Sequence, residues 1–101
     1  DVISPIMRKI NPKVWLRIKA NLRVRTEHVR VGGMHTDVGD YGHTTSIYYI
    51  NTNDGYTSFE NGDTYNSVEN RMITFPSHLR HAGSTPSNVK ARFVINFNYF
   101  K

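Results

Sequence analysis

The stretch TTSIYYIN, residues 44–51, decides the fold of this 101-residue chain. It is dominated by β-branched and aromatic side chains, which fit the pleated, half-buried surface of a strand. The triplet Asn53-Asp54-Gly55 follows closely and is typical of a turn. The segment is therefore predicted to be a strand that leads into a tight turn.

Similar strands and turns follow on the C-terminal side of this stretch. We expect further strands at residues 56–59, 71–75 and 91–100, with a turn at 61–63 and a turn-rich loop at 83–88. The turns recur about every ten residues, a spacing typical of a sandwich, barrel or jelly roll. The sequence therefore predicts a mainly β fold.

The N-terminal side is less regular. Apolar residues recur between residues 6 and 18, interrupted by Pro12, and this predicts a short helix that begins near Asn11 with Pro12 in its first turn. From Leu22 the pattern changes, because Leu22 and Val24 alternate with charged residues as in a half-buried strand. Residues 1–21 are thus expected to form a helical lead-in.

Composition restricts the classes of protein to consider. The length suits one domain, and the absence of cysteine excludes disulfides and thiolate metal sites. No stretch approaches the length of a membrane span, so a cytoplasmic location and no membrane partner are expected. Residues 1–30 hold eight of the thirteen Lys and Arg residues, but not in one continuous run. A solvated surface is therefore expected there, not a nucleic-acid interface.

The triplet His35-Thr36-Asp37 is the main candidate for chemistry. In an extended chain, residues i and i+2 point to the same side, which presents the imidazole and the carboxylate to one point. A histidine from a distant strand would complete the two-histidine, one-carboxylate set of non-haem iron(II) oxygenases. His81 is preferred over His78 for this position, because small residues follow it and let the backbone pass close to a metal.

Arg92 is the second candidate. It lies eleven residues after His81 and opens an otherwise apolar strand. Burying an unpaired guanidinium is expensive, so an inward Arg92 needs an anionic partner, and a carboxylate suits its planar fork. An exposed arginine at the start of a strand is the alternative interpretation, and the spacing from His81 favours the inward one.

Taken in order, these motifs resemble the 2-oxoglutarate/iron(II)-dependent oxygenase superfamily, most closely its prolyl 4-hydroxylase-like branch. The order is His-x-Asp, a strand ending Tyr-Tyr-Ile-Asn, Gly-x-Thr-x-Phe, Phe-Pro, His, and Arg in the last strand, over residues 31–100. The resemblance implies a double-stranded β-helix, that is, a cupin-like jelly roll with a short N-terminal helix in this chain.

The resemblance assigns roles to particular residues. The residues that match the iron ligands are His35, Asp37 and His81. Arg92 matches the basic residue that binds the distal carboxylate of 2-oxoglutarate. Tyr49 matches a tyrosine that hydrogen-bonds the same carboxylate, and Thr57 matches a segment that lines the cosubstrate pocket.

The implied activity is hydroxylation of a peptidyl, prolyl or small-molecule substrate. It uses Fe(2+), 2-oxoglutarate and O2, and it releases succinate and CO2. The loop of residues 38–45 is expected to shape the substrate pocket, and the polar residues expected to face the substrate are Tyr41, His43 and Asn98. His43 has two alternative interpretations, a metal ligand or an exposed loop residue.

The sequence also departs from the family pattern. Asp54-Gly55 stands where the family often has a glycine pair, and the usual additional N-terminal helices are missing. Residues 1–101 are therefore expected to be one catalytic domain, the C-terminal part of a longer oxygenase. Two alternatives stay open: a cupin-type metalloenzyme that does not use 2-oxoglutarate, and a non-catalytic jelly-roll binding module.

Overall fold

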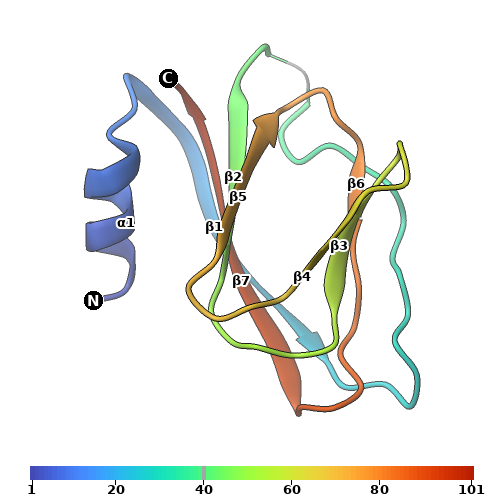
Figure 1. Ribbon diagram of the computed structural model, residues 1–101. Helices are drawn as coiled ribbons and strands as arrows, with labels where there is room; N and C mark the ends of the chain where they lie inside the picture. The colour runs from blue at the N-terminus through green and yellow to red at the C-terminus, as the bar shows by residue number, and fades with distance from the viewer. Residues whose placement is uncertain (40) are drawn as a thin grey trace.

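A computed structural model describes residues 1–39 and 41–101, and it shows a helix and two antiparallel β-sheets in layers (Figure 1). The elements in chain order are α1 (Ile3–Ile10), β1 (Val14–Val24), β2 (Thr44–Tyr49), β3 (Tyr56–Phe59), β4 (Thr64–Asn66), β5 (Met72–Pro76), β6 (His81–Gly83) and β7 (Ala91–Phe100). None of the described helices is long and apolar enough to cross a membrane. The mainly β prediction is confirmed.

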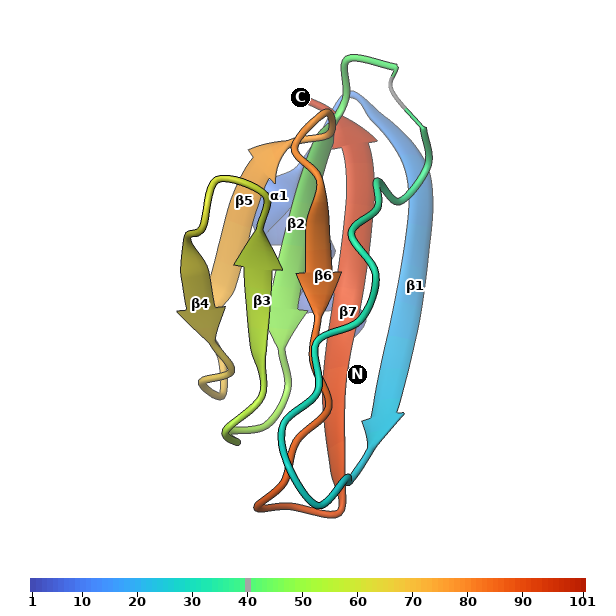
Figure 2. The ribbon, with the colours of Figure 1, turned by 90° about the vertical axis from the view of Figure 1, so that its right-hand side faces the viewer.

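The larger sheet has the strand order β1-β7-β2-β5, and the smaller sheet has the order β4-β3-β6. Figure 2 shows the smaller sheet in front of the larger one, with the connection from β1 to β2 passing beside β6 and in front of β7. Sequence neighbours are thus distributed between the layers, which is the arrangement of a jelly roll.

The long strand β7 supplies both faces of the larger sheet. Successive side chains of a strand point to opposite faces, and on one face Ile95, Phe97 and Tyr99 pack against α1 and Trp15. On the other face Val94 packs with residues of β2, β3 and β5 between the two sheets. The helix and the smaller sheet therefore cover opposite faces of β7.

The helix ends where the sequence predicted that it would begin. Asn11 takes the left-handed conformation, with φ of 43°, and its backbone N–H donates to the carbonyl of Met7 at 2.9 Å. A left-handed Asn followed by proline is a common way to terminate a helix, so the Asn11-Pro12 pair is a stop signal here. At the other end, the carboxylate of Asp1 accepts hydrogen bonds from the backbone N–H and hydroxyl of Ser4.

The prediction of a helical lead-in over residues 1–21 is likewise wrong beyond Ile10, because β1 already begins at Val14. Its pairing with β7 has a register shift between Trp15 and Arg17. This bulge leaves Trp15 on the helix side, while Arg17 pairs with Asn98 on the side that faces the smaller sheet.

The inward face of β1 also differs from the prediction. Leu22 and Val24 are 54% and 64% exposed, whereas Arg23 between them is half-buried and lines a cavity. The alternation itself was predicted correctly, but the charged residues take the inner side. The inward position of these charged side chains indicates that the space between the sheets near β1 is polar.

Candidate metal centre

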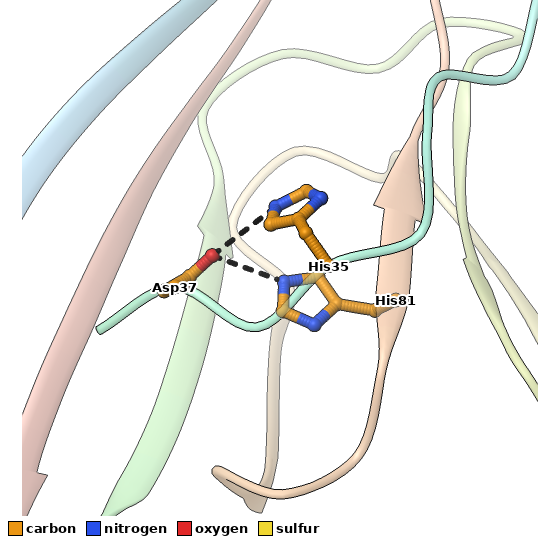
Figure 3. Close-up of side chains that lie close together, drawn as sticks. All are labelled: His35, Asp37 and His81. Carbon is orange, nitrogen blue, oxygen red and sulfur yellow. Dashed lines mark ion pairs between the residues drawn. The ribbon is translucent and has the colours of Figure 1, made fainter. Parts of the chain in front are cut away.

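Two chain segments far apart in sequence bring His35, Asp37 and His81 together (Figure 3). His35 lies in the connection between β1 and β2, and His81 begins β6. The backbones of the two histidines form an antiparallel bridge, with N–H···O distances of 2.9 and 3.0 Å in the two directions. Asp37 lies two residues beyond His35, so the bridge positions all three side chains.

The three side chains converge on a small volume. One ligand atom from each lies within 4.8 Å of the others. Oδ1 of Asp37 is 3.3 Å from Nε2 of His35 and 3.2 Å from Nε2 of His81. The side chains of Asp37 and His81 are each 4% exposed, whereas that of His35 is 49% exposed. The centre is therefore buried on two sides and reached from solvent past His35.

Both histidines are oriented by their backbone surroundings. Nδ1 of His35 lies 2.9 Å from the carbonyl of Gly33, and Nδ1 of His81 lies 3.3 Å from the carbonyl of Leu79. A carbonyl can only accept, so in each ring Nδ1 is the donor, and in the neutral form of the ring Nε2 is the nitrogen that carries the lone pair. This is the tautomer in which Nε2 can bind a metal.

Asp37 is held from two further directions. Nδ2 of Asn96 in β7 donates to its Oδ2 at 3.0 Å, and Nη2 of Arg17 in β1 donates to its backbone carbonyl at 3.3 Å. Burial by itself raises the pKa of Asp37, but His81, Asn96 and His35 together outweigh burial and hold this pKa below its ordinary value. Asp37 is therefore a carboxylate at neutral pH.

The residues fit a divalent metal ion. Nε2 of His81 is buried and makes no hydrogen bond, although it faces the Asp37 carboxylate. A buried polar atom without a partner is costly, and a metal ion in this position would satisfy it. Two imidazole nitrogens and one carboxylate oxygen form a set that suits iron(II) and leaves further coordination positions open.

The residues predicted to bind the cosubstrate form a connected cluster beside this centre. Arg92 is 4% exposed and donates from Nε to Ser67 at 2.8 Å and from Nη2 to Thr57 at 3.2 Å. Tyr49 and Thr57 share a hydrogen bond of 2.6 Å between their hydroxyl oxygens. The guanidinium carbon of Arg92 also lies 5.6 Å from the centre of the Tyr49 ring. The structure therefore brings these three predicted residues together.

Arg92 has no carboxylate partner among the residues that the structure describes. Burial lowers the pKa of its guanidinium, and the nearby charge of Arg23 lowers this pKa further. Arginine nevertheless stays charged at neutral pH. An inward guanidinium that is buried and surrounded by hydroxyl groups is a strong site for an anion.

One cavity joins the two clusters. It has a volume of about 280 Å³, and its lining includes His35, Asp37 and His81, called the triad below, together with Thr57 and Arg92. Tyr49 is fully buried and is not part of this lining. We therefore place Tyr49 behind Thr57, where it orients the hydroxyl that faces the cavity.

The remaining sequence candidates lie elsewhere. His43 is 3% exposed, which contradicts its interpretation as an exposed loop residue, and it does not join the group of metal-ligating side chains. Asn98 is fully buried, and its Oδ1 accepts a hydrogen bond from Thr45 at 2.9 Å. His28 and His78 are exposed, as is Tyr41. In the loop of residues 38–45, residue 40 lies outside the described part of the chain.

Sequence reasoning missed several residues of the site. Asn96 is hydrogen-bonded to Asp37, and Ser67 is hydrogen-bonded to Arg92. Arg17 and Arg23 line the cavity. Alternation along β7 offered a signal for Asn96, since it shares a face with Arg92 four residues earlier. No pattern in the sequence distinguishes Ser67, which lies in the connection after β4.

The sequence matches no protein-family model and no curated protein. Solved structures do resemble the chain. A cupin protein from Bacteroides fragilis is 7% identical, with a TM-score of 0.59 over 82% of this chain and 64% of that one. KdgF from Halomonas sp. is 14% identical, with a TM-score of 0.51 over 86% of each chain.

An iron enzyme is also among these structures. HppE, solved in its Fe(II) form with substrate, is 8% identical, with a TM-score of 0.58 over 87% of this chain. The chain spans 52% of the length of HppE and 64% of the length of the Bacteroides fragilis cupin. Identities this low establish architecture alone. The chain therefore has the jelly-roll fold of the cupin-like proteins.

Proposed function

We propose that this chain is an Fe(II)- and 2-oxoglutarate-dependent dioxygenase that hydroxylates a peptidyl or small-molecule substrate. The observation that carries the proposal is the buried Arg92 guanidinium, which shares one cavity with His35, Asp37 and His81 and lacks an acidic partner among the described residues. A metal site alone requires no such arginine. A metal site combined with a buried carboxylate receptor suits a keto diacid.

His35, Asp37 and His81 are the residues that would hold iron(II). When bound, the iron would supply open coordination positions for 2-oxoglutarate and dioxygen. The carbonyl groups of Gly33 and Leu79 keep Nε2 of each histidine directed at the centre. The low pKa of Asp37 keeps this ligand ionised and available at neutral pH.

The second cluster would fix the orientation of the cosubstrate. Arg92 offers its free guanidinium edge to the distal carboxylate, while Ser67 and Thr57 hold the rest of the group in place. The Thr57 hydroxyl, which is hydrogen-bonded to the hydroxyl of Tyr49, is a second donor in the same wall of the cavity. Ile47 and Val94 also line the cavity and help to exclude water from the bound diacid.

A second candidate is a cupin-type metalloenzyme that does not use 2-oxoglutarate. The likeness in fold to cupin proteins and to Fe(II) HppE favours it. This function needs the triad but gives Arg92 only the task of binding an anionic substrate. The two candidates therefore differ in whether 2-oxoglutarate binds at the metal.

Calorimetric titration of 2-oxoglutarate into the protein tests the proposal. The protein is loaded with Mn(II), which replaces iron and avoids turnover. We expect saturable 1:1 binding, weakened about a hundredfold in Arg92→Gln, since a buried charge pair is broken. Arg25→Gln is the matched control, because Arg25 is exposed and lies outside the cavity lining.

The other outcomes separate the alternatives. Metal binding without 2-oxoglutarate binding would contradict the dioxygenase and support the second candidate. A folded chain that binds no metal would support a non-catalytic jelly-roll module. Equal affinity for 2-oxoglutarate in wild type and Arg92→Gln would remove Arg92 from the cosubstrate site.

A further inference from the structure

We infer that the substrate of this site is a small molecule that carries an oxyanion, either a carboxylate or a phosphoryl-type group, bound by Arg17 and Lys19 of β1. The inference rests on the proposed function, because it assigns Arg92 to the cosubstrate. It goes beyond that function by naming the chemical class of the substrate and the residues that select it.

The register of β1 against β7 directs four polar side chains into the cavity. Directly opposed residues of an antiparallel pair project to the same face. The inward residues of β7, Asn98, Asn96, Val94 and Arg92, are opposite Arg17, Lys19, Asn21 and Arg23 of β1. All four of these β1 residues line the cavity. The wall that β1 contributes is therefore polar and mostly cationic.

The positions along the strands separate two anion sites. Arg23 is opposite Arg92, so these two arginines lie at the cosubstrate end. Lys19 is opposite Asn96, which is hydrogen-bonded to the triad carboxylate, and Arg17 is one inward position further on. Lys19 thus lies beside the candidate metal centre. Arg17 lies beyond it, on the side away from Arg92.

Arg17 has a hydrogen-bond donor without a partner. Its Nη2 donates to the backbone carbonyl of Asp37, but its Nε is buried and has no hydrogen-bond partner. Nδ2 of Asn98, directly opposite, is also buried without a partner. Neither Arg17 nor Lys19 forms an ion pair with an acidic side chain among the described residues. The unpartnered Nε of Arg17 and Nδ2 of Asn98 are donors that an oxyanion would satisfy. An unpartnered acceptor nearby, Oδ1 of Asn96, belongs to the residue opposite Lys19, whose ammonium is a donor.

The charges of the cavity lining call for a second anion. Arg17, Lys19, Arg23 and Arg92 face a single carboxylate, Asp37, which leaves an excess of three positive charges. Iron(II) and doubly charged 2-oxoglutarate cancel each other, so the loaded site keeps this excess. An anionic substrate reduces the excess, whereas a neutral one leaves cations that are partly desolvated and unpaired.

The same placement argues against a nucleic-acid partner. Three of the eight basic residues in the first thirty line a cavity of about 280 Å³. A nucleic-acid backbone needs a row of cations on an accessible surface. A concave wall between two sheets instead suits a small anionic molecule.

Calorimetric titrations with methyl phosphate and with acetate test the inference on the full chain. Each probe is titrated without cosubstrate and again with Fe(II) and saturating 2-oxoglutarate under anaerobic conditions. We expect at least one probe to bind in both conditions. Its affinity falls about tenfold in Arg17→Gln and in Lys19→Gln, as the loss of one charged hydrogen bond predicts. The probe that binds more tightly identifies the substrate class.

Matched controls keep the result specific. Arg25→Gln and Lys13→Gln remove the same charges from exposed positions outside the cavity lining and should leave the affinity unchanged. Lys19→Gln guards against indirect effects, since Lys19 is exposed and has no contact with Asp37 comparable to that of Arg17.

Equal affinity in wild type, Arg17→Gln and Lys19→Gln, or no binding of either probe, would overturn the inference. Competition of the probe with 2-oxoglutarate would also overturn it, by moving the anion site to Arg92. Failure of 2-oxoglutarate itself to bind would instead refute the proposed function.

Discussion

Nδ2 of Asn96 in β7 donates a hydrogen bond of 3.0 Å to Oδ2 of Asp37, across 59 residues of sequence. This bond fixes the carboxylate so that its other oxygen, Oδ1, faces both histidines. Hydrogen bonds to metal ligands orient them and tune their basicity. Asn96 therefore links the last strand to the candidate metal centre.

Asn96→Ala is predicted to weaken binding of a divalent metal by about 10- to 100-fold, as expected for loss of a ligand-orienting group. Equilibrium titration with Fe(II) or Mn(II) measures the change. Asn21→Ala is the control, because Asn21 lines the same cavity opposite Val94 and away from Asp37. Unchanged affinity in Asn96→Ala would show that Asp37 needs no such support.

Gly55 provides the space that Arg92 occupies. A Cβ at Gly55 would lie 2.7 Å from Cδ of Arg92 and 2.7 Å from Oδ1 of Asn53, which is too close for either. Gly55→Ala is therefore predicted to displace the guanidinium and to raise the concentration of 2-oxoglutarate needed for binding, by about tenfold or more. Gly33→Ala is the control, since a Cβ there meets nothing within 4 Å. Equal cosubstrate affinity in the two variants would argue that Arg92 is not pre-positioned.

Phe97 and Phe93 lie on the same face of β7, but only Phe97 is fully buried, in contact with Trp15. Phe97→Ala is predicted to lower the free energy of unfolding by about 3–5 kcal/mol. Phe93→Ala, at a position 39% exposed, should cost clearly less. Urea unfolding of both variants measures the difference. Similar losses would mean that α1 does not seal this face in solution.

Asp54 joins the turn after β2 to the turn before β7. Its carboxylate accepts hydrogen bonds from the hydroxyl and backbone N–H of Ser87, and these hold the pKa of Asp54 below its ordinary value. A lowered pKa in the folded state adds stability above the unfolded value of about 4, and this stability is lost as pH falls further.

Asp54→Asn is accordingly predicted to unfold at a lower temperature than wild type at pH 7. The gap should narrow at a second pH below the lowered pKa of Asp54, where the wild-type carboxylate becomes protonated. Thermal unfolding followed by circular dichroism at both pH values tests this. Ser87→Ala removes the hydroxyl donor but keeps the backbone N–H, so it should show the same trend to a smaller degree, whereas a gap independent of pH would exclude the carboxylate as its cause.

The sequence predicted the C-terminal strands well, because turn signals flank each of them. Residues 56–59 and 91–100 match β3 and β7, and residues 44–51 contain β2. The strand β4 was not predicted, since all three of its residues are exposed and carry no pattern of burial. The Asn11-Pro12 pair was misassigned because the same two residues suit either end of a helix.

The grouping of the candidate site was predictable because His35 and Asp37 are two residues apart, and because His81 and Arg92 follow in the order of the family that the motifs resemble. The cationic wall of β1 was not predictable. A bulge between Trp15 and Arg17 changes which residues face inward, and such a shift leaves no signal in the order of apolar residues. The apolar residues at the end of β1 then suggest the wrong face.

The central claim is that 2-oxoglutarate chelates a metal held by His35, Asp37 and His81. Anaerobic titration of the protein with Fe(II) and 2-oxoglutarate tests it most directly, by the weak visible metal-to-ligand charge-transfer band of a bound keto acid. We predict the band in wild type and in His78→Ala, whose histidine is exposed, and its loss in His81→Ala. A folded, iron-loaded protein without the band, or a band that persists unchanged in His81→Ala, would contradict this account.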